Sequence, residues 1–287
     1  MKTFSRFLLF AILPITLVSC GFESPSTSNL KVLGTGIIRG TDTAPEAAIT
    51  RATVLFNKPN GKFCTGVLLN DHVVLTAAHC VTGLNPGPGM FVYVPETNKS
   101  CFSANVTEIS EAPKVNPKDN YPPDLALLKL NRAICNTPTV TFAPTPQVNQ
   151  VVTAAGFGEG STPGLPDFMN LKVIRSDKTS LRSLYLNGYE KDSDVLEDWK
   201  LVDENYDEFS SMYLFALATQ PEQSLCHGDS GGPVYQEQNG ALTVYGVIGG
   251  GFPHSKKGVG SCQNTYLQMF APIGPSIQWL EGTLKRW

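Results

Sequence analysis

The sequence predicts an all-β fold made of short strands. Its 287 residues include 26 glycines and 21 prolines, a high content for a helical protein and one that suits frequent turns. Short runs of β-branched and other apolar residues recur along the chain with turn residues between them. Hydrophobic residues make up 41% of the chain and charged residues 16%, a balance typical of a globular protein with a sizeable core. Together these observations predict β-barrels or a β-sandwich.

Each predicted strand is a β-prone run bounded by turn residues. In chain order the runs are residues 52–56, 65–69, 72–76, 90–94, 126–130, 151–155 and 242–248. One helical signal closes the chain, where Pro275 precedes a run ending at Glu281. The stretch 176–208 is charged and only weakly periodic, so it is predicted to be an insertion over the surface.

The N-terminus has the features of a targeting segment, and residues 1–19 are predicted to be a signal peptide. A positive start precedes a nearly continuous apolar run over residues 7–18, which is too short for a standard membrane span. Leu17-Val18-Ser19-Cys20 resembles a bacterial lipobox, whose cleavage would leave a lipidated Cys20. An ordinary secretory signal that happens to contain cysteine is the alternative. Residues 20–36 follow as a flexible linker or propeptide.

Cysteine content and charge limit the class of protein further. Of seven cysteines, a lipidated Cys20 would leave six, enough for three disulfides in an exported protein. No Cys-x-x-Cys or paired-histidine spacing occurs, so no metal site is predicted. The formal net charge of −3 and the lack of a basic cluster argue against a nucleic-acid partner.

Three separate motifs carry the chemistry. Gly228-Asp229-Ser230-Gly231-Gly232-Pro233 places one serine among glycines that allow a sharp turn. Upstream stand Thr76-Ala77-Ala78-His79-Cys80 and an aspartate before an apolar strand, Asp124-Leu125-Ala126-Leu127-Leu128. Serine becomes an effective nucleophile only when a base takes its proton, which is the role a histidine held by an aspartate performs.

In the order His, Asp, Ser, these motifs resemble the trypsin/chymotrypsin family of serine endopeptidases, across about residues 37–287. The resemblance implies two six-stranded antiparallel β-barrels with a C-terminal helix. Barrel one would cover about 37–146 and barrel two about 147–287, with the active site between them. It also implies protein or peptide substrates, no cofactor and a monomer.

The family's mechanism implies a role for each motif residue. His79 would take the proton of the Ser230 hydroxyl, and Asp124 would hold the imidazole in the required tautomer. The backbone N–H groups of Gly228 and Ser230 would form the oxyanion hole. The resemblance also implies disulfide pairs, the third by elimination: Cys64–Cys80, Cys226–Cys262 and Cys101–Cys135.

The resemblance also implies a substrate pocket, whose residues are assigned by their offset from Ser230. Ser224 occupies the position at the bottom of the primary pocket, where no carboxylate is present to pair with arginine or lysine. A neutral pocket suggests cleavage after large apolar or aromatic residues, and Leu225 on its wall would narrow it. Gly249-Gly250-Gly251 is expected to pair with the substrate backbone as an added strand.

The start of the resembling region suggests activation by cleavage. Ile37 matches the family's new N-terminus, whose ammonium would pair with the otherwise costly buried carboxylate of Asp229. Gly36 precedes it, so a trypsin-like cut is unsupported. Cleavage here would separate the protease from Cys20. We therefore expect a lipid-tethered precursor in a bacterial cell envelope, on the outer membrane, that is released extracellularly on processing.

Two other functions share these residues. A non-catalytic binding protein could use the same scaffold, although such relatives usually lose one triad residue and all three are present here. An esterase could use the same triad, because acyl transfer does not require an amide.

Overall fold

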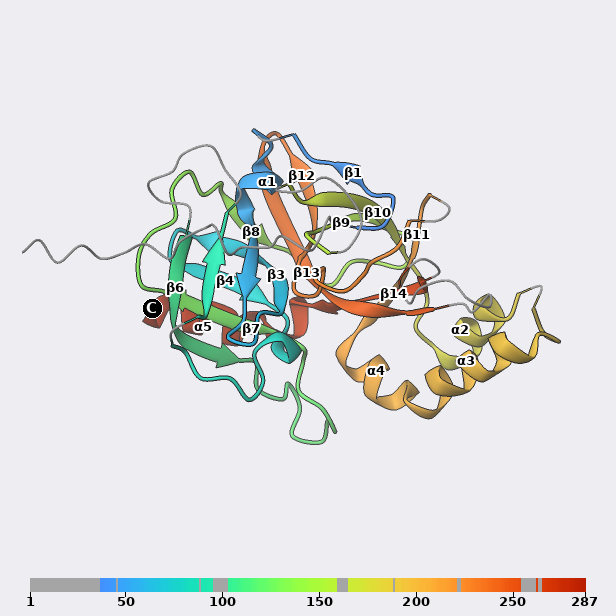
Figure 1. Cartoon of the computed structure of the whole chain (residues 1–287). Helices are drawn as coiled ribbons and strands as arrows, with labels where there is room; N and C mark the ends of the chain where they lie inside the picture. Colours follow the sequence, from blue (N-terminus) through green and yellow to red (C-terminus); the bar gives the residue numbers. More distant parts are fainter. Residues whose placement is uncertain are drawn as a thin grey trace, which may run out of the picture. The chain divides into compact units, whose positions relative to one another are not determined.

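The computed structural model describes residues 37–287 except 45, 88, 95–102, 159–164, 188, 221–222, 254–261 and 263–264. The signal peptide, Cys20 and linker predicted for residues 1–36 lie outside the described residues. In the described part the chain forms two β-barrels (Figure 1). The predicted all-β architecture of two six-stranded antiparallel barrels is confirmed.

Barrel one closes in the strand order β2-β3-β4-β7-β6-β5. Its strands are β2 (Thr53–Asn57), β3 (Phe63–Asn70), β4 (Val73–Thr76), β5 (Phe91–Tyr93), β6 (Ser103–Glu111) and β7 (Ala126–Leu130). A short helix, α1 (Ala48–Ala52), leads into β2. Continuous burial along β4 and nearly so along β7 places these two strands in the middle of the core, which explains their unbroken apolar sequence.

Barrel two closes because β9 pairs with both β12 and β10, and β10, β11, β14, β13 and β12 complete the ring. Its strands are β9 (Val151–Gly156), β10 (Asp167–Val173), β11 (Leu214–Ala218), β12 (Pro233–Gln238), β13 (Ala241–Pro253) and β14 (Thr265–Pro272). Two further strands join the same sheet: β1 (Thr41–Asp42) pairs with β10, and β8 (Val140–Phe142) runs parallel to β13.

Each end of the described chain contacts the half of the fold encoded at the opposite end. β1 belongs by sequence to the first half but adds to the sheet of barrel two. The C-terminal helix α5 (Ile277–Arg286) returns to barrel one, where Trp279 Nε1 donates to Ser110 Oγ on β6 at 3.2 Å. Residues 37–42 and 140–142 therefore pair with barrel two, although the resemblance assigned them to barrel one.

The charged stretch predicted as a surface insertion folds into three helices (Figure 1). They are α2 (Lys178–Tyr185), α3 (Ser193–Glu204) and α4 (Tyr206–Met212). Asp177 caps α2 and Asp192 caps α3 through their side chains. On α3, Val195, Trp199 and Val202 are buried, a spacing that forms one helical face. This spacing was a helical signal that the sequence interpretation missed.

The insertion is fixed to barrel two by aromatic contacts. The ring of Phe209 on α4 meets that of Phe252 on β13 edge-on, with centroids 4.8 Å apart. Tyr185 and Trp199 join α2 to α3 at 5.6 Å. The C-terminal end of α4 leads directly into β11, so the insertion delivers its last residue, Tyr213, to the edge of barrel two.

Candidate active site

The strand register brings His79 and Asp124 together. β4 and β7 are antiparallel neighbours, with Thr76 opposite Ala126. His79 follows β4 in a 3₁₀ turn (Ala78–Cys80), and Asp124 comes just before β7. Because one strand ends where the other begins, both side chains leave the barrel at the same edge.

Asp124 binds His79 at two points. Its Oδ1 accepts the main-chain N–H of His79 at 2.8 Å, and its Oδ2 lies 2.7 Å from the ring Nδ1. The Asp124 side chain is 4% exposed, whereas that of His79 is 44% exposed. This arrangement holds the imidazole against a buried carboxylate and leaves the rest of the ring open to a substrate.

A third donor reaches the same carboxylate. Tyr213 Oη donates to Asp124 Oδ2 at 2.7 Å in a buried environment. Burial alone would raise the pKa of Asp124, but the hydrogen bonds and charge of His79, with the Tyr213 hydrogen bond, lower it below its usual value. Sequence interpretation missed Tyr213, because it lies far from every motif and only the fold brings it to Asp124.

The loop that carries Ser230 lies against the segment before His79. The carbonyl of Ser230 accepts the N–H of Thr65 at 2.8 Å and lies 3.8 Å from the Sγ of Cys80. Gly231 has φ +83°, and an added Cβ would come within 2.1 Å of Thr76 Oγ1. Only glycine therefore fits beside the serine, which stands half-buried next to the His79 turn.

Gly228 is confined in the same way. Its φ is +97°, and an added Cβ would lie 2.3 Å from the ring of Phe63. Its carbonyl accepts the hydroxyl of Thr65 at 2.7 Å, and the same hydroxyl accepts the N–H of Phe157 at 3.1 Å. Thr65, on β3 of barrel one, thus bonds two loops of barrel two, one of which carries the residues expected to form the oxyanion hole.

Asp229 is fully buried between these loops. Its Oδ1 accepts the N–H of Gly158 at 2.7 Å, and its Oδ2 accepts that of Cys226 at 2.8 Å. Burial raises the pKa of Asp229 to about 7, although these two hydrogen bonds act in the opposite direction. The predicted N-terminal residue of the cut form, Ile37, is also fully buried, and its neighbour Ile38 forms a β-bridge with Ser224.

A second buried carboxylate, Asp167, adjoins this region and was not predicted. It stands opposite Gly156 on β9, and the carboxylate of Asp229 packs on that same glycine. In the register of β1 and β10, the partner of Asp167 is another acid, Asp42. Burial raises the pKa of Asp167 to about 8, and a side-chain hydrogen bond with Asp42 and the charges of Asp42 and Asp229 add to the increase.

The predicted pocket residues lie around the Ser230 loop. Ser224 is buried and its hydroxyl donates to the carbonyl of Cys262. Leu225 lies in a hydrophobic cluster with Ile37, and its N–H donates to Gln268 Oε1 at 3.2 Å. The glycines Gly249, Gly250 and Gly251 all lie on β13, and Gly250 has φ +150°.

Two disulfides join the cysteine pairs that the resemblance implied. Cys64 is bonded to Cys80, next to His79, and Cys226 to Cys262, beside the Ser230 loop. Cys135 is also disulfide-bonded, and its predicted partner, Cys101, lies outside the described residues.

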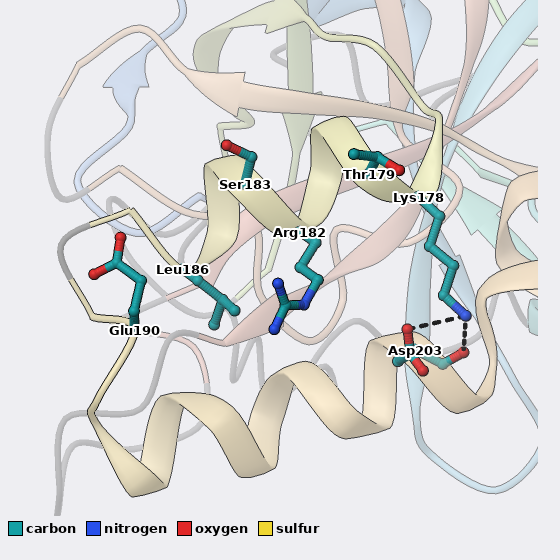
Figure 2. Close-up of a pocket in the computed structure, with 7 residues that line it drawn as sticks. All are labelled: Lys178, Thr179, Arg182, Ser183, Leu186, Glu190 and Asp203. Atoms are coloured by element: carbon teal, nitrogen blue, oxygen red, sulfur yellow. Dashed lines mark hydrogen bonds and ion pairs between the residues drawn. The ribbon is translucent and has the colours of Figure 1, made fainter.

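A cavity of about 630 Å³ opens between α2 and α3 (Figure 2). It is lined by Lys178, Thr179, Arg182, Ser183, Leu186, Glu190 and Asp203. Lys178 Nζ pairs with Asp203 Oδ1 at 2.9 Å across it, and no triad residue lines it. Over the described ranges, no group of three or more His, Cys, Asp or Glu side chains is arranged to hold a metal ion. No helix in that part of the chain is long and apolar enough to cross a membrane.

Comparison with known proteins gives a consistent result. Residues 37–273 match the protein family described as Trypsin. CLIP domain-containing serine protease B4 of Anopheles gambiae is 26% identical over 304 residues, which cover 94% of this chain and 78% of that protein. Trypsin theta of Drosophila melanogaster is 25% identical over 223 residues, covering 75% of this chain and 76% of that protein.

The solved structures that share the fold include two scabies mite inactivated protease paralogues, S-D1 and S-I1. S-D1 has a TM-score of 0.59 at 18% identity, covering 87% of this chain and 97% of its own. S-I1 has a TM-score of 0.56 at 20% identity, covering 86% of this chain and 100% of its own.

Proposed function

Because this chain belongs to the trypsin family, we propose that it is a serine endopeptidase that uses His79, Asp124 and Ser230. The observation that carries the proposal is the double hydrogen bond between His79 and a buried Asp124, next to a serine on a glycine-constrained loop. This arrangement supplies a base, a group that orients it and a nucleophile.

The chemistry follows from the donors and acceptors. With Nδ1–H donated to Asp124, Nε2 of His79 is the free base that takes the proton of the Ser230 hydroxyl. The serine oxygen attacks the peptide carbonyl, and His79 returns the proton to the leaving amine to give an acyl-enzyme, which water then hydrolyses. The N–H groups of Gly228 and Ser230 would stabilise the oxyanion. Losing one such donor typically removes about 3 kcal/mol of transition-state stabilisation.

A fluorophosphonate probe tests the enzyme proposal directly. Purified chain is expected to be labelled on Ser230, with labelling abolished in S230A and strongly reduced in H79A. A correctly folded and processed protein that is not labelled would be a binding protein on a protease scaffold. This outcome has a precedent in the fold, since the two structural relatives described above are named as inactivated proteases.

Matched ester and peptide substrates separate an endopeptidase from an esterase. Both reactions pass through the same acyl-enzyme, so only the acylation step differs. Turnover of the peptide in each pair supports the proposal, whereas turnover of the ester alone would make the protein an esterase.

We propose a preference for large apolar or aromatic residues before the cleaved bond. Ser224 provides no carboxylate, and its hydroxyl is already committed to the carbonyl of Cys262. A substrate lysine or arginine would therefore find no counter-charge from this residue. Profiling a peptide library with processed protein tests the preference, and dominant cleavage after lysine or arginine would contradict it.

Activation by cleavage between Gly36 and Ile37 is also part of the proposal. Burial of Asp229 without a cationic partner is costly, and the new ammonium of Ile37 would supply that partner. A trypsin-like protease would need arginine or lysine before the cut, and Gly36 stands there instead, so the protease that makes the cut is not identified. N-terminal sequencing of the labelled species tests this point: an active form still beginning at Cys20 would contradict it.

We propose that the protein is exported and works as a monomer. The disulfides support an oxidising compartment. Lipid attachment and membrane binding through Cys20 remain proposals that rest on the lipobox-like sequence. The relatives named above are insect proteins, which lend no support to a bacterial outer membrane. Incorporation of labelled palmitate, lost in C20A, tests the lipid, and size-exclusion chromatography tests the monomer.

A further inference from the structure

We infer that Tyr213 is a positioning residue of the active site, which holds Asp124 in place for His79 through its hydroxyl. The inference builds on the proposed peptidase function, because it assigns a fourth side chain to the same His79–Asp124 pair. It assigns a purpose to the helical insertion as well, since Tyr213 follows that insertion directly.

Among the described residues, His79 and Tyr213 supply the hydrogen bonds to the Asp124 carboxylate. Oδ1 accepts the main-chain N–H of His79, and Oδ2 is shared by the His79 ring and the Tyr213 hydroxyl, both at 2.7 Å. Three donors around one buried carboxylate restrict its rotation about the last side-chain bond. The Tyr213 hydroxyl therefore fixes the orientation in which Oδ2 faces the imidazole.

Gly249 makes room for the tyrosine ring. A Cβ added at Gly249 would lie 2.2 Å from Cε1 and 2.7 Å from Cδ1 of Tyr213. No residue other than glycine could occupy this position while the ring stays where it is. The first glycine of the β13 triplet thus has a steric reason that the substrate-edge interpretation did not include.

The insertion sets the position of Tyr213 from the other side. The N–H of Tyr213 donates to the carbonyl of Phe209 at 2.8 Å, and this hydrogen bond ends α4. The ring centroids of Phe209 and Tyr213 lie 6.4 Å apart. Phe209 in turn contacts Phe252 on β13. Immediately after Tyr213 the chain enters β11, which pairs with β14. The tyrosine is therefore held between a helix end and a strand start, both anchored to barrel two.

Tyr213 is suited to be a permanent donor. Burial, followed by the charge of Asp124 and the hydrogen bond to it, raises the pKa of Tyr213 above its usual value. The hydroxyl therefore keeps its proton throughout the pH range in which a histidine base works. It donates without competing for the proton that His79 exchanges with Ser230.

The test is Y213F, with Y206F as its matched control. Tyr206 lies in the same insertion, and its hydroxyl donates to the carbonyl of Ser176 at 2.7 Å, so Y206F removes an equivalent bond without reaching Asp124. Because Tyr213 bonds a charged group, Y213F is expected to lower kcat about tenfold with little change in KM, and Y206F to leave both unchanged.

An NMR readout makes the inference testable without catalysis. The His79 Nδ1 proton lies in the bond to Oδ2 that Tyr213 shares, so removing the tyrosine hydroxyl is expected to move its resonance downfield in Y213F and not in Y206F. This measurement stands even if the fluorophosphonate test shows the protein to be inactive. An unchanged resonance in Y213F, or the same shift in Y206F, would overturn the inference.

A second variant approaches the same bond from β13. G249A leaves the hydroxyl intact but pushes a methyl group into the tyrosine ring. If both variants act through the bond to Asp124, the His79 Nδ1 proton resonance shifts in G249A as well. The double variant G249A/Y213F then shows the same shift as Y213F alone. Additive shifts would mean that Gly249 and Tyr213 act independently, and would contradict the inference. Circular dichroism on each variant identifies any that fails to fold, and the remaining variants decide.

Discussion

His79 is bound to Asp124 through its backbone as well as its ring, at 2.8 Å and 2.7 Å. The main-chain bond fixes the turn that carries the histidine, and the ring bond fixes the tautomer. An asparagine at position 124 would keep the size of the side chain but present an amide that can stabilise the wrong tautomer.

D124N is therefore expected to lower kcat about 10⁴-fold with the fold retained. D119N provides the control, because the side chain of Asp119 accepts a hydrogen bond from the N–H of Asn116, within its own turn, at 2.9 Å. Kinetics on a peptide substrate and thermal unfolding of both variants make the measurement. Equal loss in D119N would contradict the assignment of Asp124.

G231A is expected to destabilise the protein and abolish activity. The added methyl group would meet Thr76 Oγ1 at 2.1 Å and the carbonyl of Thr65 at 2.3 Å, in addition to the strain of φ +83°. Gly240 has a similar φ of +75°, but a Cβ added there would meet no atom within 4 Å. G240A therefore introduces the backbone strain alone, which should lower the free energy of unfolding by about 1–2 kcal/mol.

The difference between these two glycine variants therefore measures the close approach of the Ser230 loop to barrel one. Overpacking is expected to make the free energy of unfolding of G231A about 1–3 kcal/mol lower than that of G240A. Urea unfolding gives both values. Equal destabilisation would show that the loop can move away from Thr76 without cost.

The uncut chain is expected to lose stability as the pH rises. Burial raises the pKa of Asp167 to about 8 and that of Asp229 to about 7. The native chain thus keeps protons that the unfolded chain, with aspartate pKa values near 4, releases. The free energy of unfolding therefore falls as the pH rises from about 4 to about 8.

The S230A variant lacks the nucleophile and therefore cannot cut itself. Urea unfolding of S230A at pH 5 and pH 8 measures this effect. D167N in the same background is expected to be more stable than the parent at pH 8, because the amide needs no proton to be neutral. The difference should be smaller at pH 5 and vanish toward pH 4, where Asp167 is protonated in the unfolded chain as well, while Asp42 and Asp229 are common to both. A parent that is equally stable at both pH values would contradict the prediction.

W199A is expected to loosen the insertion and to reduce kcat in the same direction as Y213F. Trp199 is 5% exposed and lies against Tyr185. Its truncation should therefore lower the free energy of unfolding by about 3–5 kcal/mol. L201A on the same helix removes a side chain that is 54% exposed and should change little. Circular dichroism and steady-state kinetics compare the two. An unchanged kcat in a destabilised W199A would show that the packing of the insertion does not affect catalysis.

Local sequence was sufficient to select the candidate triad residues, because the pattern around each of them lies in its own neighbours. His79 and Asp124 each adjoin an unbroken apolar strand, and Ser230 stands among glycines, so the pattern indicated their chemistry without the fold. The strands before His79 and after Asp124 were found because both are buried along almost their whole length.

Tyr213 and Asp167 escaped prediction because their roles depend on pairing between distant segments. Tyr213 is 89 residues from Asp124, and nothing beside it in sequence suggests a buried partner. Asp167 becomes notable only when β10 lies between β1 and β9. The insertion helices were missed for another reason: α2 and α4 are short, and charged residues on their exposed faces obscure the apolar spacing.

The exchange of chain ends between the two barrels has a consequence for how the protein can be divided. A polypeptide ending near residue 146 would lack the partners of β1 and β8, and one beginning near 147 would carry α5 with no surface to cover. Neither half of the gene therefore encodes a self-sufficient module. The barrels are expected to be inherited, expressed and unfolded as one unit, and any fusion or permutation must preserve both crossings.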